Sequence, residues 1–389
     1  MGTRLDDTRS RREFLKSIGA CTLGALSAAQ LVDLLMSPAL AAEAALHEAD
    51  RRYWMVGENG RIACGMCPNH CLLDDGKDSV CRTRTNKGGV LYTRAYANPF
   101  IIQVDPLGKL PVYHFQPGSL ALIVATGGCN LRCIYCQNWQ QSQTAPDKLQ
   151  NVLAAPVADV VKAAKGATAE KKDLAAIAFT YTDFVAFYEY ARDIARKAKE
   201  NNLRVVAGSA GYLNPKPLKE MTECVDAFTI TLKGFSETFY RNVTGATLKP
   251  VLDTLVRIKE SGRWLEVANL VVPTLNDDPK DLRAMCKWVK ANLGADTPLH
   301  FERFTRAFKL KDLPDTPIQT CELARNIALE EGLKHVYLCN ISPHDGNHTY
   351  CPKCGQVLVQ RLGFTIVNAA IGKDGACGKC GTKLPGVWS

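Results

Sequence analysis

The sequence predicts an α/β fold in which a mostly parallel sheet curls into a partial (β/α)6-type barrel, with a small cysteine-rich module on either side of it. Two observations lead to this prediction. From about residue 118, short apolar and β-branched runs alternate with amphipathic helical stretches, which is the pattern of repeated βαβ units. In addition, eleven of the sixteen cysteines fall into three clusters, within 64–81, 129–136 and 351–380.

The expected barrel begins with a strand directly before the second cysteine cluster. Right-handed crossovers repeated six or more times curl a parallel sheet toward a full or partial barrel. The carboxyl ends of such strands are where parallel α/β folds carry their chemistry. The expected strands are Leu120–Ala125, Ala176–Tyr181, Arg204–Gly208, Ala227–Leu232, Leu265–Val272, Leu299–Phe304 and His335–Leu338, and the expected helices are Phe184–Asn201, Leu248–Ser261, Pro279–Leu293 and Thr320–Glu331.

Composition narrows the class of protein. With 46% hydrophobic and 22% charged residues, the 389-residue chain is not expected to be disordered. Tight CxxC-type groups in a chain of this length indicate metal ligation rather than a disulfide framework. A net charge of +9 permits contact with nucleic acid but does not indicate it, and we do not expect nucleic acid as a partner.

The amino terminus resembles a twin-arginine export signal. Arg11 and Arg12 precede an apolar run over 17–40, and 39–41 offers an A-x-A cleavage site. We therefore expect residues 1–41 to be a signal peptide that directs the folded protein to the periplasm or another extracytoplasmic space. Gln30 and Asp33 interrupt the run, so no transmembrane span is expected in the mature chain. The alternative is a cytoplasmic protein with a chance arginine pair.

The central cluster, Cys129, Cys133 and Cys136, has CxxxCxxC spacing after two glycines. Three thiolates make a poor closed zinc site, but on a [4Fe–4S] cluster they leave one iron open. A ligand can chelate that iron through an amino and a carboxylate group, and an electron passed into its sulfonium then breaks a C–S bond. The loop therefore predicts a [4Fe–4S] cluster that binds and reductively cleaves S-adenosylmethionine.

Three segments extend the pattern to a family. The chain resembles the AmmeMemoRadiSam-system radical SAM enzymes, which are relatives of the pyruvate formate-lyase activating enzymes. The likeness covers about 60–385 and is most specific over 105–141. It is carried by the segments Cys64-Gly-Met-Cys67-Pro-Asn-His-Cys71, Asp105-Pro…Tyr113-His-Phe-Gln-Pro-Gly118 and Gly128-Cys-Asn…Cys136-Gln-Asn-Trp139.

The resemblance implies roles for five residues. Tyr135 would touch the adenine, and Asp183 would hold the methionine amino group in place of the family's Glu, with Thr182 beside it as a further cofactor-binding residue. Lys233 would contact the cofactor's carboxylate or ribose, and His300 would be a second contact. Lys233 and His300 are also the expected catalytic residues. Without the family resemblance, Lys233 is interpreted as a solvated charged residue at the end of a strand, and His300 as a histidine of the core.

Cys64, Cys67, Cys71 and Cys81 form the first flanking cluster. Four thiolates suit either a tetrahedral Zn²⁺ or a closed second iron–sulfur cluster, and spacing alone does not separate the two. Near the carboxyl terminus, two CxxC-Gly knuckles flank a predicted β-hairpin at 357–367 and predict a zinc-ribbon-like four-thiolate site of Cys351, Cys354, Cys377 and Cys380.

These observations divide the chain into a signal at 1–41, an amino-terminal four-cysteine extension at 60–117, a barrel at 118–345 and a four-cysteine ribbon at 346–389. The predicted function is that of a radical SAM enzyme, which takes an electron from a one-electron reductant and abstracts hydrogen from a substrate expected to be a protein. The alternatives are a multi-centre iron–sulfur and zinc redox or metal-handling protein that does not cleave SAM, and an RNA-modifying enzyme.

Overall fold

A computed structural model describes residues 46–149, 154–170 and 174–388. The predicted signal at 1–41 lies outside these residues. In the described part of the chain, no helix combines the length and the apolar character that crossing a bilayer requires.

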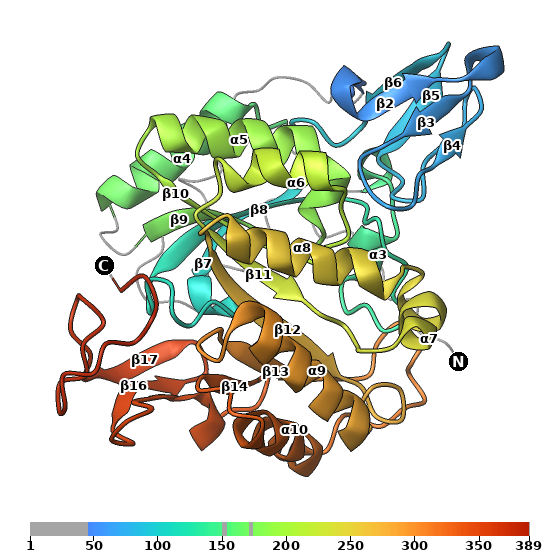
Figure 1. Cartoon of the computed structure of the whole chain (residues 1–389). Helices are drawn as coiled ribbons and strands as arrows, with labels where there is room; N and C mark the ends of the chain where they lie inside the picture. Colours follow the sequence, from blue (N-terminus) through green and yellow to red (C-terminus); the bar gives the residue numbers. More distant parts are fainter. Residues whose placement is uncertain (1–45, 150–153, 171–173, 389) are drawn as a thin grey trace, which may run out of the picture.

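The centre of the molecule is an eight-stranded sheet with the order β14-β13-β12-β11-β10-β9-β8-β7 (Figure 1). The seven strands from β8 to β14 pair in parallel. They are β8 (Leu120–Thr126), β9 (Leu174–Phe179), β10 (Arg204–Ser209), β11 (Ala227–Thr231), β12 (Trp264–Val271), β13 (Leu299–Arg303) and β14 (Val336–Cys339). A mostly parallel sheet whose strands alternate with helices is the arrangement that the alternating apolar runs predicted.

Each of the seven predicted strands is present, with small shifts at its ends. The second one ends earlier than expected, at Phe179, because Tyr181 adopts a φ of 68° that no strand continues through. The sequence pattern did not indicate β7 (Pro99–Pro106), which pairs antiparallel with β8. Part of the expected amino-terminal extension at 60–117 is thus the edge strand of the central sheet.

The helices that connect the strands pack on one side of the sheet (Figure 1). The four predicted helices are confirmed, although the first opens with a 3₁₀ turn at Phe184–Phe187. The structure adds α4, α6 and three short elements. The helices are α3 (Trp139–Ser142), α4 (Val157–Glu170), α5 (Tyr188–Glu200), α6 (Pro215–Thr222), α7 (Glu237–Phe239), α8 (Leu248–Glu260), α9 (Pro279–Leu293) and α10 (Ile318–Glu330), and the π-helical turn Tyr240–Thr244 follows α7.

The other side of the sheet is filled by the segment that follows β7. Leu107, Leu110, Val112 and Phe115 are buried there against small side chains of the strands, such as Ala121. Glu266 of β12 receives hydrogen bonds from the backbone N–H groups of this segment, at 2.9 Å from Tyr113 and 2.8 Å from His114. The indole of Trp264 and the ring of His300 complete its four partners, at 2.9 and 2.7 Å.

The amino-terminal module consists of two small antiparallel sheets. One contains β1 (His47–Glu48), β6 (Val90–Thr93) and β5 (Arg84–Lys87), and the other contains β2 (Trp54–Val56), β3 (Ile62–Cys64) and β4 (Leu72–Leu73). Arg84 and Glu189 of α5, each 2% exposed, form a bidentate ion pair with both N–O distances at 2.8 Å. This pair joins the module to the barrel.

The carboxyl-terminal module is a three-stranded antiparallel sheet of β15 (Thr349–Tyr350), β16 (Val357–Leu362) and β17 (Thr365–Ala369). The hairpin predicted at 357–367 is confirmed as β16 and β17. Buried Arg361 of β16 donates to the carbonyl oxygens of Tyr113 and Asn347, at 3.1 and 3.0 Å, so the module is fastened to the segment that fills the sheet.

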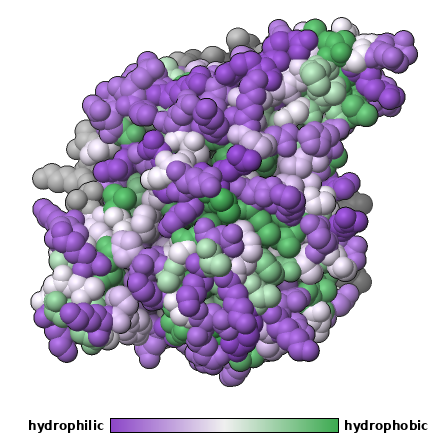
Figure 2. Space-filling view, in the orientation of Figure 1, coloured by the Kyte–Doolittle hydropathy of each residue, from purple (hydrophilic) through white to green (hydrophobic). Residues whose placement is uncertain are grey.

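The surface is hydrophilic over most of the face shown in Figure 2. Hydrophobic side chains gather on the amino-terminal module, where Met55, Val56 and Leu72 are exposed.

The buried carboxylate of Glu266 allows a stability test. We expect Glu266→Gln to lower the free energy of unfolding by on the order of 3 kcal/mol, because the amide turns one acceptor into a donor that faces other donors. The same change at exposed Glu260 of α8 is the matched control. Thermal unfolding followed by circular dichroism would measure both, and equal melting temperatures would contradict the expectation.

Candidate metal and cofactor sites

The CxxxCxxC loop leaves the carboxyl end of β8 and turns immediately. Gly128 has a φ of 88°, and a Cβ atom there would lie 2.5 Å from the carbonyl oxygen of Cys81. At Gly127 a Cβ atom would lie 2.7 Å from Leu149 and 3.0 Å from the carbonyl oxygen of Thr144. Both glycines are therefore required by close approach, and Gly128 also by its backbone conformation.

Hydrogen bonds from distant segments hold this loop in place. The N–H groups of Arg132 and Ile134 donate to the carbonyl oxygens of Thr244 and Val243 at 2.8 and 3.0 Å, and these belong to the π-helical turn. The amide of Asn130 donates to the carbonyl of Tyr212 at 2.6 Å. The loop is thus fixed by the segments after β10 and β11, and its cysteines are held by tertiary contacts.

The three thiols of the loop lie at the boundary of the core. Cys133 is buried, and Cys129 and Cys136 are half-buried. The N–H of Leu131 donates to Cys129 Sγ at 3.4 Å, and Cys136 Sγ lies 3.3 Å from Ser142 Oγ. The three sulfur atoms do not all come within 4.8 Å of one another, so they do not surround one point as the ligands of a single ion do.

Asp183 stands at the carboxyl end of the next strand. It is buried, and its carboxylate accepts from Ala210 N at 2.8 Å, Val185 N at 3.1 Å and Ser209 Oγ at 3.0 Å. Burial raises the pKa of Asp183, and these hydrogen bonds oppose that rise. Its proximity helps to raise the pKa of the Cys129 thiol, after the larger effect of burial. Asp183 therefore places an acidic group beside the cysteine loop.

Lys233 follows β11 at the same edge of the sheet. Its Nζ lies 5.7 Å from the centre of the Tyr135 ring, within range of a cation–π contact. Burial acts against its charge, but Cys133 and Cys136 outweigh burial and raise the pKa of Lys233. The backbone at Lys233 is held by Tyr240, whose hydroxyl accepts from the Lys233 N–H at 3.1 Å, and by Asn276, which donates to the Lys233 carbonyl at 2.7 Å.

The buried hydroxyl of Tyr135, in the cysteine loop, has no hydrogen-bond partner within the described chain. Buried polar groups are normally paired, so an orphaned hydroxyl indicates a missing polar partner. Three separated thiols, a carboxylate, an ammonium and the orphaned Tyr135 hydroxyl therefore fit an iron–sulfur cluster together with a zwitterionic ligand.

Thr182 and His300 have partners of their own. Thr182 donates to the carbonyl of Thr126 at 2.8 Å, which ties the end of β9 to the end of β8. His300 is fully buried on β13, with Nε2 2.7 Å from Glu266 and Nδ1 3.6 Å from Cys339 Sγ. The structure thus engages both ring nitrogens of His300 inside the protein and does not bring them to the cysteine loop.

Sequence reasoning missed Glu302, two residues after His300 on β13. Burial raises the pKa of Glu302, and the nearby charge of Lys233 opposes that rise. Because Glu302 lies at the carboxyl end of a parallel strand, the rule that drew attention to Asp183 and Lys233 could also have found it.

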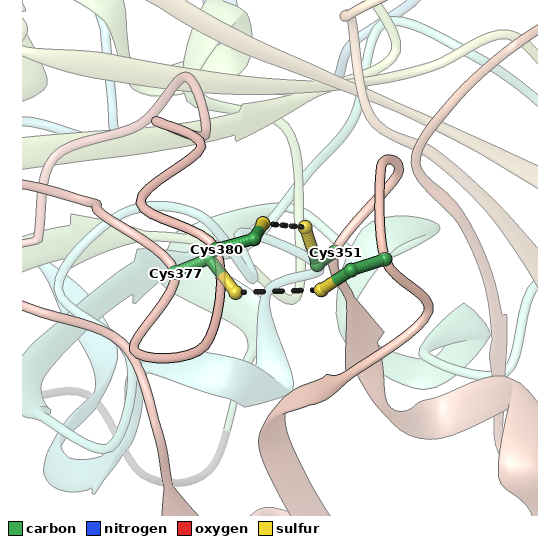
Figure 3. A group of neighbouring side chains, drawn as sticks. Cys351, Cys377 and Cys380 are labelled. Atoms are coloured by element: carbon green, nitrogen blue, oxygen red, sulfur yellow. Dashed lines mark hydrogen bonds between the residues drawn. The ribbon is translucent and has the colours of Figure 1, made fainter.

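The carboxyl-terminal cysteines converge on one point. All four Sγ atoms lie within 4.8 Å of one another, and Figure 3 shows the side chains of Cys351, Cys377 and Cys380 turned toward a common centre. Cys351 and Cys380 are 3.6 Å apart, and Cys354 and Cys377 are 3.7 Å apart. A tetrahedral ion with metal–sulfur bonds of about 2.3 Å separates its ligands by about 3.8 Å, so this group can hold one metal ion.

The amino-terminal cysteines share a cavity. Cys64, Cys67, Cys71 and Cys81 all line it, together with Arg84 and with Asn130 of the CxxxCxxC loop. The predicted ligand set is therefore brought together, directly beside the central loop.

The chain is similar to several known proteins. Residues 123–289 match the radical SAM superfamily. The uncharacterized protein MJ0808 of Methanocaldococcus jannaschii is 40% identical over 329 residues, which are 84% of this chain and 96% of that protein. The pyruvate formate-lyase-activating enzyme of Clostridium pasteurianum is 24% identical over 238 residues, which are 57% of this chain and 92% of the enzyme.

Among solved structures, Streptococcus suis SuiB bound to S-adenosylmethionine is similar to this chain, with a TM-score of 0.46 and 9% identity. The match covers 60% of this chain and 53% of SuiB.

The contact between Gly128 and Cys81 gives a prediction about both cysteine groups. We expect Gly128→Ala to destabilise the protein and to reduce the iron retained after anaerobic reconstitution, because the new Cβ displaces backbone at Cys81. Gly294→Ala is the matched control, since Gly294 has a similar φ of 93° but no atom within 4 Å of a new Cβ. The control should lose about 1–3 kcal/mol from backbone strain, because its φ of 93° and ψ of 152° suit glycine alone, and it should keep its iron. Equal effects at the two glycines would contradict the proposed packing.

Proposed function

We propose the function of this chain from its family. The chain belongs to the radical SAM superfamily of enzymes and is in one family with the archaeal protein MJ0808. In this proposal the chain cleaves S-adenosylmethionine reductively and uses the resulting radical to abstract hydrogen from a protein substrate. The observation that carries the proposal is the three-thiol loop at the carboxyl end of β8, with Asp183 and Lys233 at the same edge of the sheet.

Cys129, Cys133 and Cys136 would hold the cluster, each on a different iron. When bound, a [4Fe–4S] cluster with one open iron supplies the electron that breaks a C–S bond of S-adenosylmethionine, giving methionine and a 5′-deoxyadenosyl radical. The hydrogen bonds that Arg132, Ile134 and Asn130 donate would keep the three thiolates at their separation.

The charged residues beside the loop would orient the cofactor. Asp183 is an acceptor for the methionine ammonium group, and Lys233 is a donor for its carboxylate or for the ribose. Tyr135 offers a ring face to the adenine and a hydroxyl that has no protein partner. Thr182 would help to position Asp183, because its hydroxyl donates to the Thr126 carbonyl and holds the chain after β9 in place beside Asp183. Glu302 joins these residues as a further acidic group in the site.

A protein substrate is supported by similarity to the Clostridium pasteurianum enzyme, whose name states that it activates pyruvate formate-lyase. The motifs at Cys64–Cys71, Asp105–Gly118 and Gly128–Trp139 support placement in the AmmeMemoRadiSam-system group. Export through the twin-arginine route is part of the proposal and rests on residues 10–41 alone. It would require S-adenosylmethionine and a one-electron reductant to reach the enzyme before or after export.

We further propose that the carboxyl-terminal group binds Zn²⁺ in a structural role. Four protein thiolates leave no position open for a substrate. The ribbon packs through Arg361 against the segment that fills the sheet, so an ion there would stabilise that packing.

The central experiment measures cofactor cleavage. Residues 42–389 are reconstituted anaerobically with iron and sulfide, reduced, and supplied with S-adenosylmethionine, and we expect 5′-deoxyadenosine to accumulate. Cys133→Ala should abolish the product because it removes a cluster ligand, whereas Cys321→Ala, in the helix α10, should keep it. A wild-type protein that carries its full iron content but makes no 5′-deoxyadenosine would point to a redox or metal-handling protein.

The role of Lys233 can be separated from cluster assembly. We expect Lys233→Met to weaken S-adenosylmethionine binding about 10- to 100-fold, the loss that corresponds to about 1.5–3 kcal/mol for a charge-assisted hydrogen bond. Its iron content should match that of the wild type. Lys311→Met, an exposed lysine, is the control. Unchanged affinity, measured by equilibrium dialysis, would remove Lys233 from the binding site.

A further inference from the structure

The amino-terminal cysteines line one cavity. Cys64 ends β3, Cys67 and Cys71 lie in the loop before β4, and Cys81 precedes β5. Cys64, Cys67 and Cys81 are buried, and Cys71 is half-buried. The loop that carries Met66 is anchored on the barrel through Asn214, which donates to the Gly65 carbonyl at 2.8 Å and to the Met66 carbonyl at 3.1 Å. The four thiols therefore face one cavity at the junction of module and barrel.

The spacing of these sulfurs differs from that of the carboxyl-terminal group. Across the described residues, the ribbon cysteines form the one set of His, Cys, Asp or Glu side chains whose ligand atoms all lie within 4.8 Å of one another. The amino-terminal four share a cavity but remain more widely separated, as do the three cysteines of the CxxxCxxC loop. A single ion needs four sulfurs in contact, whereas a cubane binds each thiolate through a different iron and holds them apart.

Groups around the cavity are suited to thiolate charge. Asn69 Nδ2 donates to Cys67 Sγ, and Val80 N donates to Cys71 Sγ, each at 3.5 Å. The hydroxyl of Ser79 lies 3.0 Å from Cys81 Sγ and can donate to it. Arg84 also lines the cavity, with its guanidinium paired to Glu189. Hydrogen bonds to sulfur are among the means by which proteins stabilise iron–sulfur clusters and set their potentials.

The cavity lies directly beside the CxxxCxxC loop. Asn130 lines the cavity, and its carbonyl accepts from Asn69 Nδ2 at 2.7 Å. Gly128, next to Cys129, packs so closely on Cys81 that a Cβ would lie 2.5 Å from the Cys81 carbonyl oxygen. Arg82 forms a second bridge, because it donates to Gln143 Oε1 at 2.8 Å and Gln143 donates to the Leu131 carbonyl at 3.5 Å.

We infer that Cys64, Cys67, Cys71 and Cys81 bind a second [4Fe–4S] cluster with a thiolate on every iron, and that this cluster passes electrons to the one at Cys129, Cys133 and Cys136. An external low-potential one-electron donor protein reduces the second cluster by one electron, and the electron then moves to the first cluster without any bond being formed. The site rests on the cavity alone, whereas its role as a relay rests on the proposed function.

The test counts iron in variants that each remove one site. After anaerobic reconstitution the wild type should hold about eight iron atoms and eight inorganic sulfides per chain, because each cubane contributes four of each. Cys129→Ala/Cys133→Ala/Cys136→Ala should keep about four irons. Cys67→Ala/Cys71→Ala should also keep about four. One zinc per chain in every variant, together with wild-type circular dichroism, would show that the ribbon and the barrel remain folded.

The triple variant decides the assignment even where the amino-terminal variant fails to fold. If it holds no iron and binds two zinc ions per chain, the second site is a zinc site and the inference is overturned. If it holds four irons while wild-type protein cleaves no S-adenosylmethionine, the second cluster stands and the proposed function falls.

The relay has its own measurement. In the fully reduced wild type, the electron paramagnetic resonance signals of two adjacent clusters should broaden each other, and the broadening should vanish in both variants. Unbroadened signals in a wild type with eight irons would place the clusters too far apart for direct transfer and would overturn the relay.

Discussion

Strands β8 to β14 run in one direction, so the loops that leave their carboxyl ends crowd onto one edge of the sheet. Asp183 after β9 and Lys233 after β11 are 50 residues apart in the chain, yet both act electrostatically on the cysteine loop after β8. Parallel pairing brings them to the same edge of the sheet. The chemistry proposed for this edge depends on that common direction.

The opposite face of the sheet is closed by polar contacts as well as apolar packing. Glu266 binds the backbone of Tyr113 and His114 and the ring of His300, and Arg361 reaches the same segment from the ribbon. Burial lowers the pKa of His114 to about 3, so its ring is neutral at physiological pH. The carboxyl-terminal module thus helps to close this face of the sheet. A metal ion in the ribbon would therefore affect the stability of the barrel that carries the site.

The three cysteine groups differ in how they are held. The ribbon cysteines meet through two local turns, with Gly355 and Gly381 at φ of 69° and 71°. The two other groups are held by contacts between distant segments, such as Asn69 with Asn130 and Arg132 with Thr244. The sulfur atoms within each of these two groups do not all lie within 4.8 Å of one another. Sulfur atoms that meet at one point favour a single ion, and separated sulfur atoms favour a cluster.

Features that depend only on residues close together in the chain could be predicted from the amino-acid sequence. The period of the apolar runs predicted seven strands and four helices, and cysteine spacing predicted three ligand groups, because both patterns lie within single segments. Other features became visible only in the folded chain. The pairing of β7 with β8, the partners of His300 in Glu266 and Cys339, the position of Glu302 near Lys233, and the packing of Gly128 on Cys81 join residues that are far apart in the chain. No local pattern specifies such contacts, because they form only when the sheet closes and segments compete for the same buried space.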